Sequence, residues 1–382
     1  VRRSHRLPKT LHWAVVEKIA NSKVTEFAHI MHFLLGKDIV ALIPNTNVSL
    51  LASWYHNRMD KGPRMKSLQY TYLVNTAARL LPIDLKPTMS EAVAPLVTNP
   101  DLLPSSDSAA AVQAVIGRIQ DVNRPCPIDP WYEKAANDFL SFAVPLTPIP
   151  AEEIHEHLSN TKTRNRALAY LSGYETPGSV KVKAFVKKES YSDVKDPRNI
   201  SPTDDANMTE LSLYTYSAKI NLLKFQPWYC PGRTPPEIAN AVVSTCLLGP
   251  VLETDFSRFD GTITPALRRL VEKEFYRRCF GERAADLVEK EISQVRARAS
   301  QLPYDTLGSR LSGSPLTTDG NTLINAFVQY CVARKLGIPY SGLAFGDDGI
   351  LSVPGSDDDR VVFDKVAEDF GLRAKVFFGN TL

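Results

Sequence analysis

Three short polar clusters constrain the last third of this chain more than any other feature. They occur in the order Asp255-Phe-Ser-Arg-Phe-Asp260, Ser312-Gly-Ser-Pro-Leu-Thr-Thr-Asp-Gly-Asn321 and Gly346-Asp-Asp348. Because Asp255 and the last cluster are about 90 residues apart, only tertiary folding can bring their carboxylates together. Each cluster alone could be ordinary turn chemistry on a protein surface. Together they are typical of a phosphoryl-transfer site, which needs charge neutralised and oxygens held in line.

The residues around the first and third clusters predict where the carboxylates lie. Apolar residues directly before Asp255 place it at the end of a short strand. The segment 343–353 predicts a hairpin, in which Gly346 and Gly349 take positive φ at the tip and leave the two aspartates between them exposed. Carboxylate oxygens are hard ligands that suit Mg²⁺ or Mn²⁺ rather than zinc. We therefore expect a pair of such ions at this site.

The middle cluster predicts a loop followed by a helix. Ser312-Gly-Ser-Pro is typical of a loop, and apolar residues recur at helical spacing after it. Thr317, Asn321 and Asn325 then share one helix face. Gly320 within this helix indicates that another backbone or a ligand comes close. The alternative interpretation is a buried helix with a solvated polar side.

Asn321 is the residue of this helix that indicates what the site selects. Its amide can both donate and accept hydrogen bonds, so it can bridge Asp260 to a ribose 2′-hydroxyl. That hydroxyl is the group that distinguishes RNA from DNA. The spacing therefore predicts a site that prefers ribonucleotides.

The three clusters resemble motifs A, B and C of viral RNA-dependent RNA polymerases. The segment Lys187-Lys-Glu189 with Lys195-Asp-Pro-Arg198-Asn-Ile200 resembles their motif F, a basic strand over the incoming triphosphate. Residues 228–239 and 103–114 more loosely resemble the replicase of nodaviruses. The resemblance implies an RNA-dependent RNA polymerase, which transfers nucleotides from NTPs onto a nascent RNA templated by viral RNA, with two Mg²⁺ or Mn²⁺ ions.

The resemblance also implies roles for the matching residues. Asp255 and Asp347 match the two metal-binding aspartates, and Asp348 matches an aspartate that assists the metal site. Lys375 is the candidate general acid of motif D. The positions that match nucleotide-binding residues are Asp260, Ser312, Gly313, Thr317, Asn321, Arg198, Lys187, Lys188 and Lys195.

The basic segment has its own pattern beside this resemblance. Apolar residues alternate with Lys181 and Lys183, which predicts a strand with both lysines on one face. Pro197 favours an extended backbone next to Arg198, whose planar guanidinium suits paired hydrogen bonds to phosphate. A plain solvent-exposed strand face is the alternative.

The fold class expected from these patterns is α+β, a right-hand polymerase palm of antiparallel sheet with helices, plus fingers. The thumb is expected to be missing, because the chain ends directly after the motif D strand. The expected segments are a mostly helical N-terminal region (1–100), a proline-rich connection (101–150), fingers with motif F at 181–202 (151–250), and the palm (251–382). Within the palm, the expected parts are motifs A (255–260), B (312–325) and C (346–348), a finger insertion near 276–310, and a partial motif D (357–378).

Composition excludes several other classes of protein. The net charge of +3 over 382 residues is too small to indicate nucleic-acid binding by itself. Five cysteines without a CxxC pair favour reduced thiols in a cytosolic compartment. All seven histidines lie at or before His157, which argues against a Ser-His-Asp site around Ser312. No apolar run is long enough to predict a membrane span, and the stretch 27–43 is better explained as a core helix.

The expected partners are template and product RNA and NTPs. Because the chain begins at Val1 and lacks a thumb, we expect a fragment whose membrane association depends on missing parts. The expected location is the host cytoplasm, in membrane-associated replication complexes, which for nodavirus-like replicases lie on the mitochondrial outer membrane. One alternative is a reverse transcriptase, which has no use for the Asp260 and Asn321 pair. The other is a catalytically inactive RNA-binding module.

Overall fold

The protein is described by a computed structural model. The structure describes residues 70–72, 102–104, 108–173, 182–189, 196–293, 296–299 and 302–379, and the helix expected at 27–43 lies outside them. The chain divides into two compact units. The first unit comprises Val1–Arg118, Ala184–Ile200 and Ala299–Leu302, and the second comprises Ile119–Lys183, Ser201–Arg298 and Pro303–Leu382. The four expected segments stay predictions.

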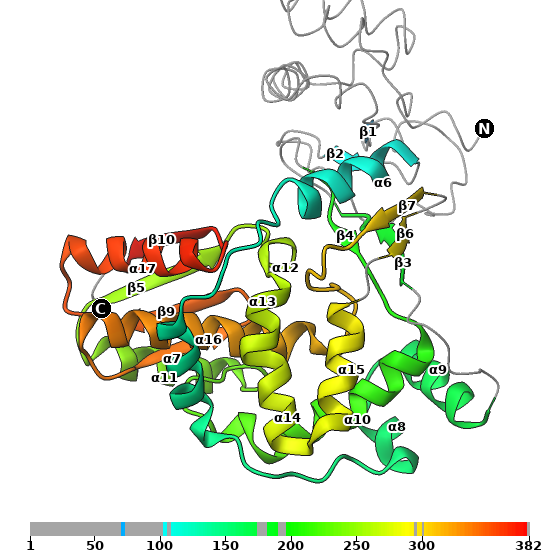
Figure 1. The fold of residues 1–382 in the computed structure, drawn as a ribbon, viewed down its shortest axis with the longest axis horizontal. Helices are drawn as coiled ribbons and strands as arrows, with labels where there is room; N and C mark the ends of the chain where they lie inside the picture. The colour runs from blue at the N-terminus through cyan, green and yellow to red at the C-terminus, as the bar shows by residue number, and fades with distance from the viewer. Residues whose placement is uncertain are drawn as a thin grey trace, which may run out of the picture. The chain divides into compact units, whose positions relative to one another are not determined.

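The second unit contains a four-stranded antiparallel sheet with the strand order β10-β5-β9-β8 (Figure 1). Its strands are β5 (Val251–Phe256), β8 (Gly342–Phe345), β9 (Asp348–Ser352) and β10 (Ala374–Phe378). Along β5, Thr254 and Phe256 are buried while Glu253 and Asp255 are exposed. Because side chains alternate across a strand, one face of β5 enters the core and the other carries Asp255. This sheet and its helices confirm the α+β prediction at the level of mixed architecture.

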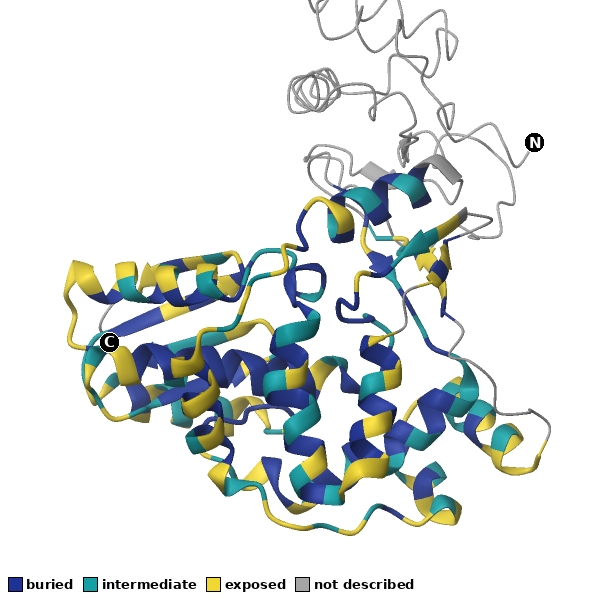
Figure 2. Cartoon of the chain, in the orientation of Figure 1, coloured by how far each residue is buried: buried dark blue, intermediate teal, exposed yellow. Residues whose placement is uncertain are grey.

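Three helices pack against this sheet, and one of them, α11 (Pro235–Cys246), contacts β8 and β9. Helix α16 (Leu316–Leu336) contacts β8 and β9, while α17 (Asp357–Asp369) contacts β10 and α16. Figure 2 shows α16 as buried over much of its length, and Phe327 on α16 packs against Phe370 with ring centroids 5.6 Å apart. Gly337, with φ of 69°, ends α16 in the left-handed conformation. The helix predicted after the middle cluster is therefore confirmed.

The remaining helices of the second unit surround this core. They are α7 (Pro130–Phe139), α8 (Ile154–His157), α9 (Thr161–Leu171), α10 (Asp205–Asn221), α12 (Phe259–Thr262), α13 (Pro265–Leu267), the π-helical turn η6 (Arg268–Lys273), α14 (Glu274–Phe280) and α15 (Glu282–Ile292). The charged amphipathic pattern of residues 265–299 predicts a helical stretch broken near Gly281. The break is confirmed between α14 and α15, but helix is wrong for the last residues. Strand β6 (Arg296–Ala299) has exposed arginines alternating with buried alanines, which is the period of a strand.

A second four-stranded sheet has the order β4-β3-β6-β7. Its other strands are β3 (Val182–Val186), β4 (Asn199–Ile200) and β7 (Leu302–Asp305). The first unit contains α6 (Ser108–Val115), which leads into the π-helical turn η2 (Ile116–Gln120), and a short pair, β1 (Tyr70–Tyr72) with β2 (Leu102–Pro104). In β3, exposed Lys183 lies between buried Val182 and Ala184, which confirms the predicted alternation at Lys183, while Lys181 lies outside the described residues.

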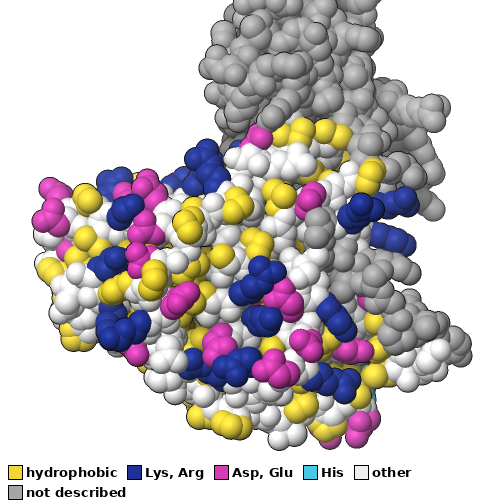
Figure 3. Space-filling model, in the orientation of Figure 1, with side chains coloured by type: hydrophobic (Ala, Val, Ile, Leu, Met, Phe, Trp, Pro, Cys, Tyr) yellow, Lys and Arg dark blue, Asp and Glu magenta, His cyan; other side chains and the backbone are white. Residues whose placement is uncertain are grey.

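The surface of the second unit carries charges of both signs, and Figure 3 shows basic and acidic side chains intermixed on the face toward the viewer. On η6, α14 and α15 they form ion pairs such as Arg277–Glu274 within α14 and Arg269–Glu289 between η6 and α15. All five cysteines have free thiols. Within the part of the chain that the structure describes, none of the helices has the length and apolar character that a membrane crossing requires.

Candidate active site

The sheet register brings the predicted carboxylates together. Asp255 on β5 pairs with Asp348 on β9 on one side and with Lys375 on β10 on the other. Asp348 in turn pairs with Phe345, the last residue of β8. The fold therefore joins Asp255 of the first cluster and Asp348 of the third cluster across two neighbouring strands, as the sequence predicts.

The turn between β8 and β9 consists of Gly346 and Asp347, and Gly346 has a φ of 64°. This confirms the predicted hairpin and its exposed aspartates. The prediction of a positive φ at Gly349 is wrong, because this residue lies inside β9. A Cβ atom there would lie 2.9 Å from the Leu343 carbonyl oxygen and 3.0 Å from Thr254 Oγ1. Gly349 is thus required by close packing and not by a turn.

Mutual repulsion shapes the electrostatics of the carboxylates. Burial raises the pKa of Asp347, and the charges of Asp348, Asp260 and Asp255 raise it further. Burial also raises the pKa of Asp348, with Asp255 adding to the shift. The ammonium of Lys375 lies 3.4 Å from Asp255 Oδ2. One nearby lysine leaves an excess of negative charge, which an incoming cation would offset.

The donor chemistry of this cluster fits a hard divalent cation, since it offers carboxylate oxygens from two adjacent strands and a turn. Among the residues that the structure describes, no three His, Cys, Asp or Glu side chains already form a metal-binding group. Asp255, Asp347 and Asp348 are nevertheless the described residues that would hold such an ion, because their side chains are exposed beside one another.

Helix α16 holds the hairpin through polar side chains. The Gly346 amide donates to Thr322 Oγ1 at 2.9 Å. Asn325 Nδ2 donates to the carbonyl oxygens of Gly346 and Asp348, at 3.1 and 2.9 Å, and Gln329 Nε2 donates to the Leu343 carbonyl oxygen at 3.0 Å. The predicted polar stripe is therefore neither solvated nor entirely directed at a nucleotide. The sequence interpretation missed Thr322 and Gln329, although each lies one helical turn from Asn325 of the stripe.

Asp260 and Asn321 are joined directly. Asn321 Nδ2 donates to Asp260 Oδ1 at 2.7 Å, which confirms the predicted contact between the first two clusters. Arg310 contacts both partners, because its backbone amide donates to the Asp260 carbonyl oxygen and its Nε donates to Asn321 Oδ1, each at 2.9 Å. Arg258, with φ of 57°, turns the chain between β5 and α12, where Asp260 lies.

The loop before α16 is fixed by its own contacts. The Thr317 hydroxyl lies 3.0 Å from the Leu311 carbonyl oxygen and 2.8 Å from that of Ser314. A Cβ atom on Gly313 would lie 2.7 Å from the Pro202 Cα atom, so only glycine fits there. Ser312 is half-buried in this loop. Thr317 therefore shapes the loop with its hydroxyl, a role that the sequence did not predict.

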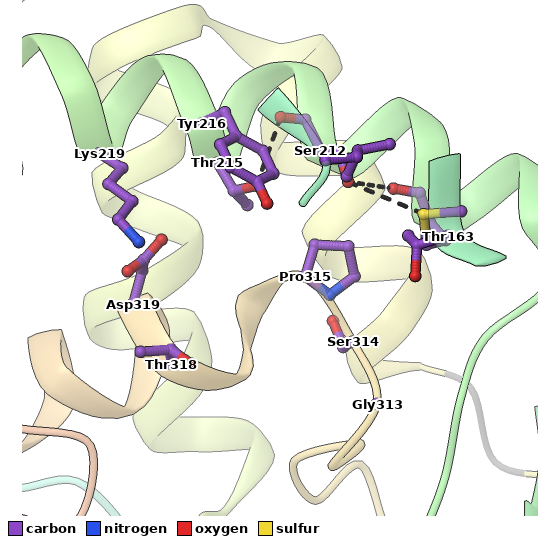
Figure 4. Close-up of a pocket in the computed structure, with 12 residues that line it drawn as sticks. Thr163, Ser212, Thr215, Tyr216, Lys219, Gly313, Ser314, Pro315, Thr318 and Asp319 are labelled. Atoms are coloured by element: carbon purple, nitrogen blue, oxygen red, sulfur yellow. Dashed lines mark hydrogen bonds between the residues drawn. The ribbon is translucent and has the colours of Figure 1, made fainter. Parts of the chain in front are cut away.

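The same loop lines a pocket with helix α10, shown in Figure 4. Lys219 of α10 and Asp319 of α16 point toward one another there. Tyr229 donates its hydroxyl hydrogen to Asp319. Burial raises the pKa of Asp319, while the Tyr229 hydrogen bond and the Lys219 charge act in the opposite direction. The pocket belongs to the packing between α10 and the loop.

A network of four charged side chains lies beside α16, each with no exposed surface. Arg268 Nη2 donates to Glu272 Oε1 at 3.0 Å and to Glu291 Oε1 at 2.8 Å, and Arg310 pairs with Glu272. The sequence predicts that a backbone or a ligand approaches Gly320. The structure corrects this, because a Cβ atom there would lie 2.7 Å from Arg310 Nη2 and 2.8 Å from Glu272 Oε2. The glycine makes room for a buried ion pair.

The basic candidates belong to the first unit. Lys187 Nζ lies 2.8 Å from Glu189, the Arg198 Nε atom lies 3.8 Å from the same carboxylate, and Lys188 is exposed. The Lys187 amide donates to the Arg198 carbonyl oxygen at 2.9 Å, which extends the pairing of β3 with β4. Lys195 lies outside the described residues.

Two residues missed from the sequence hold the segment that carries Arg198. Gln113 Nε2 donates to Asp196 Oδ1 at 2.6 Å, and Arg118 donates through Nε and Nη2 to the Asp196 carbonyl oxygen at 3.0 and 2.7 Å. Asp196 is buried, and a Cβ on Gly117 would overlap its side chain. Gln113 lies within the 103–114 segment that resembles nodavirus replicases. That resemblance is the one sequence signal that could have pointed to Gln113.

Comparison with known proteins agrees with the motifs. Residues 224–375 match the family described as viral RNA-dependent RNA polymerase. The RNA-directed RNA polymerase of striped jack nervous necrosis virus is 35% identical over 299 residues, which are 73% of this chain and 30% of the relative. That of Pariacoto virus is 34% identical over 275 residues, 67% of this chain and 28% of the relative.

A third relative, the RNA-directed RNA polymerase of Macrobrachium rosenbergii nodavirus, is 30% identical over 213 residues, which are 51% of this chain and 20% of the relative. The chain thus spans less than a third of the length of each of these relatives. The matched region contains all three clusters that form the carboxylate row and the Asp260 and Asn321 pair. The chain is therefore related to the RNA-directed RNA polymerases of nodaviruses, and its residues 224–375 match the viral RNA-dependent RNA polymerase family.

Proposed function

We propose that this chain provides the catalytic centre of an RNA-dependent RNA polymerase, which adds ribonucleotides from NTPs to an RNA strand templated by RNA. The observation that carries the proposal is the cross-strand row of Asp255 and Asp348 with Asp347 in the adjoining turn. In this proposal, the β10-β5-β9-β8 sheet with α16 and α17 is the palm, and the basic β3 strand belongs to the fingers.

The carboxylates would hold two Mg²⁺ or Mn²⁺ ions. When bound, these ions supply a lowered pKa at the primer 3′-hydroxyl and charge compensation at the triphosphate. Asp255 and Asp347 would be the principal ligands, with Asp348 assisting. Lys375, close to Asp255, would donate a proton to the leaving pyrophosphate.

The choice of ribonucleotides would come from the hydrogen-bonded Asp260 and Asn321. A carboxylate acceptor next to an amide donor can bind one hydroxyl group, which both donates and accepts. The exposed guanidinium of Arg198 would bind the triphosphate, assisted by Lys187 and Lys188. The expected location, membrane-associated replication complexes of the host cytoplasm, is part of this proposal through the resemblance alone.

The first prediction tests the metal ligands. Asp347→Ala or Asp255→Ala should lower the rate of nucleotide incorporation on a primed RNA template by about a thousandfold, since each removes several kcal/mol of transition-state stabilisation. Assays use the 382-residue chain and, in parallel, the complete reading frame that encodes it. Glu253→Ala, which removes another exposed carboxylate from β5, is the matched control.

Incorporation that persists in Asp347→Ala would contradict the assignment of the ligands. If the unmodified protein binds RNA but incorporates no nucleotide with Mg²⁺ or Mn²⁺, the alternative of an inactive RNA-binding module is correct. A preference for deoxyribonucleotides on an RNA template would instead support a reverse transcriptase.

A further inference from the structure

Arg310 binds the end of the Asn321 amide that does not face Asp260. Its Nε donates to Asn321 Oδ1 at 2.9 Å, while Asn321 Nδ2 donates to Asp260 Oδ1 at 2.7 Å. A guanidinium can only donate hydrogen bonds, so the amide atom that faces it must be the oxygen. Arg310 therefore fixes which end of the Asn321 amide faces Asp260.

This orientation decides what the pair can recognise. With the amide nitrogen toward Asp260, Asn321 has a second N–H hydrogen for a ligand, and Asp260 has a second carboxylate oxygen as an acceptor. A hydroxyl group can satisfy both. In the reversed orientation, the amide oxygen would face the carboxylate, and the site would present two acceptors that repel each other.

Arg310 is itself held rigidly. Its side chain has no exposed surface and pairs with Glu272, which also binds Arg268. Gly320 leaves the space that this pair occupies, because a Cβ atom would lie within 2.8 Å of both side chains. The Arg310 backbone amide also donates to the Asp260 carbonyl oxygen at 2.9 Å. One residue thus ties both members of the pair to the buried network.

We propose that Arg310 is a positioning residue for sugar selection, which acts by fixing the amide orientation of Asn321. The inference rests on the proposed function and adds a determinant that does not touch the nucleotide. Loss of Arg310 should weaken discrimination between ribonucleotides and deoxyribonucleotides. A residue that only stabilised the fold would change the rates with both substrates by the same factor.

The test compares kcat/KM for a matched NTP and dNTP in single-nucleotide incorporation, using the 382-residue chain and the complete reading frame. Arg310→Met combined with Glu272→Met removes one buried ion pair and leaves Arg268 paired with Glu291. The NTP/dNTP ratio should fall about tenfold, the usual scale for one hydrogen-bonding partner. Arg310→Lys retains the charge without the planar fork, so it should lower the ratio less. The control is Arg269→Met, which removes a half-exposed arginine from the η6 turn that also carries Glu272. This variant should keep the wild-type NTP/dNTP ratio.

Circular dichroism identifies variants that do not fold. If the double variant does not fold, the NTP/dNTP ratio of Arg310→Lys tests the proposal. A wild-type ratio in Arg310→Lys and in every folded variant would overturn the inference, even where both rates fall. If the unmodified protein incorporates neither substrate, the proposed function fails instead, and the inference fails with it. The two failures are therefore distinguishable.

Discussion

The carboxylates of the β5–β9 row and the charged network around Arg268 are built from the same chemical groups in opposite surroundings. Asp255, Asp347 and Asp348 are exposed, and Lys375 is the cation paired with Asp255. The network has two arginines and two glutamates, and none of these side chains is exposed. The carboxylates therefore have an excess of negative charge, whereas the positive and negative charges of the network are equal in number.

The pKa values reflect this difference. Partial desolvation of its carboxylate in the turn and the charges of neighbouring carboxylates raise the pKa of Asp347, although the residue as a whole is exposed. Burial would also raise the pKa of Glu272, but Arg268 and Arg310 together lower it below its ordinary value. The comparison indicates that the network neutralises its own charge without external ions, whereas the carboxylate row depends on ions from solution to compensate its charge.

The largest effect is expected from breaking the balanced cluster. Arg268→Met should lower the free energy of unfolding by about 3–5 kcal/mol, because it leaves buried Glu291 without its cation. Denaturant unfolding measures this. Arg269→Met, which removes a partly exposed arginine from the same turn, should cost about 1 kcal/mol or less. Equal losses for the two variants would contradict the importance of burial.

A smaller effect is expected where helix α16 supports the exposed carboxylates. Asn325→Ala removes the donor to the Gly346 and Asp348 carbonyl oxygens and should cost about 1–3 kcal/mol of stability. It should also lower kcat with little change in the KM for nucleotide. Asn240→Ala, on the exposed side of α11, is the control. An unchanged kcat in Asn325→Ala would mean that the hairpin keeps its shape without this contact.

Divalent ions should stabilise the carboxylate row and leave the network unaffected. At tenfold excess over the dissociation constant, Mg²⁺ should add about 1.4 kcal/mol to the free energy of unfolding. Thermal unfolding with and without Mg²⁺ measures the gain. The gain should be much smaller in Asp255→Asn, and a full gain in that variant would place the ion elsewhere.

The smallest effect concerns pH. Because the folded protein raises the pKa of Asp347, ionisation of this group opposes folding above its ordinary value of 3.8. In metal-free buffer, Asp347→Asn should therefore stabilise the protein at pH 7, by about 0.5 kcal/mol or less. The gain should disappear below pH 3.8, where both states are protonated.

The pKa of Glu272 is shifted in the opposite direction to that of Asp347, so its ionisation favours folding. Its lowered pKa contributes stability above its ordinary value of 4.5, which is lost as the pH falls through the folded value. Melting temperatures of wild type and Asp347→Asn between pH 7 and pH 3 would separate the two trends. A gain that grows as the pH falls would show that repulsion at Asp347 has been assigned the wrong sign.

The sequence predicts the parts of this site that depend on neighbouring residues. Apolar residues before Asp255 specify its strand, Gly346 permits the turn, and Gly337 ends α16, so each signal lies within a few residues of its effect. The hydrogen bond between Asn321 and Asp260 is predicted by the order of the three clusters together with the ability of an amide to donate to a carboxylate.

The buried network could not be predicted in the same way. Arg268, Glu272 and Glu291 lie in a charged amphipathic helical sequence, and only the packing of η6, α15 and the loop at Arg310 encloses them. The reason for Gly320 follows from that packing. Likewise, the contacts of Gln113 and Arg118 with Asp196 join segments far apart in the chain, without a local signal.

The bond between the Gly346 amide and Thr322 has a consequence for motion. Tips of exposed hairpins ordinarily open and close easily, and their amide hydrogens exchange quickly with water. Here the tip is bonded to Thr322, whose hydroxyl in turn donates to the Thr318 carbonyl oxygen 2.7 Å away in α16. The Gly346 amide should therefore exchange at a rate set by the opening of a buried helix. The distance between Asp255 and Asp347 would then fluctuate with the amplitude of a packed core, although both carboxylates face the solvent.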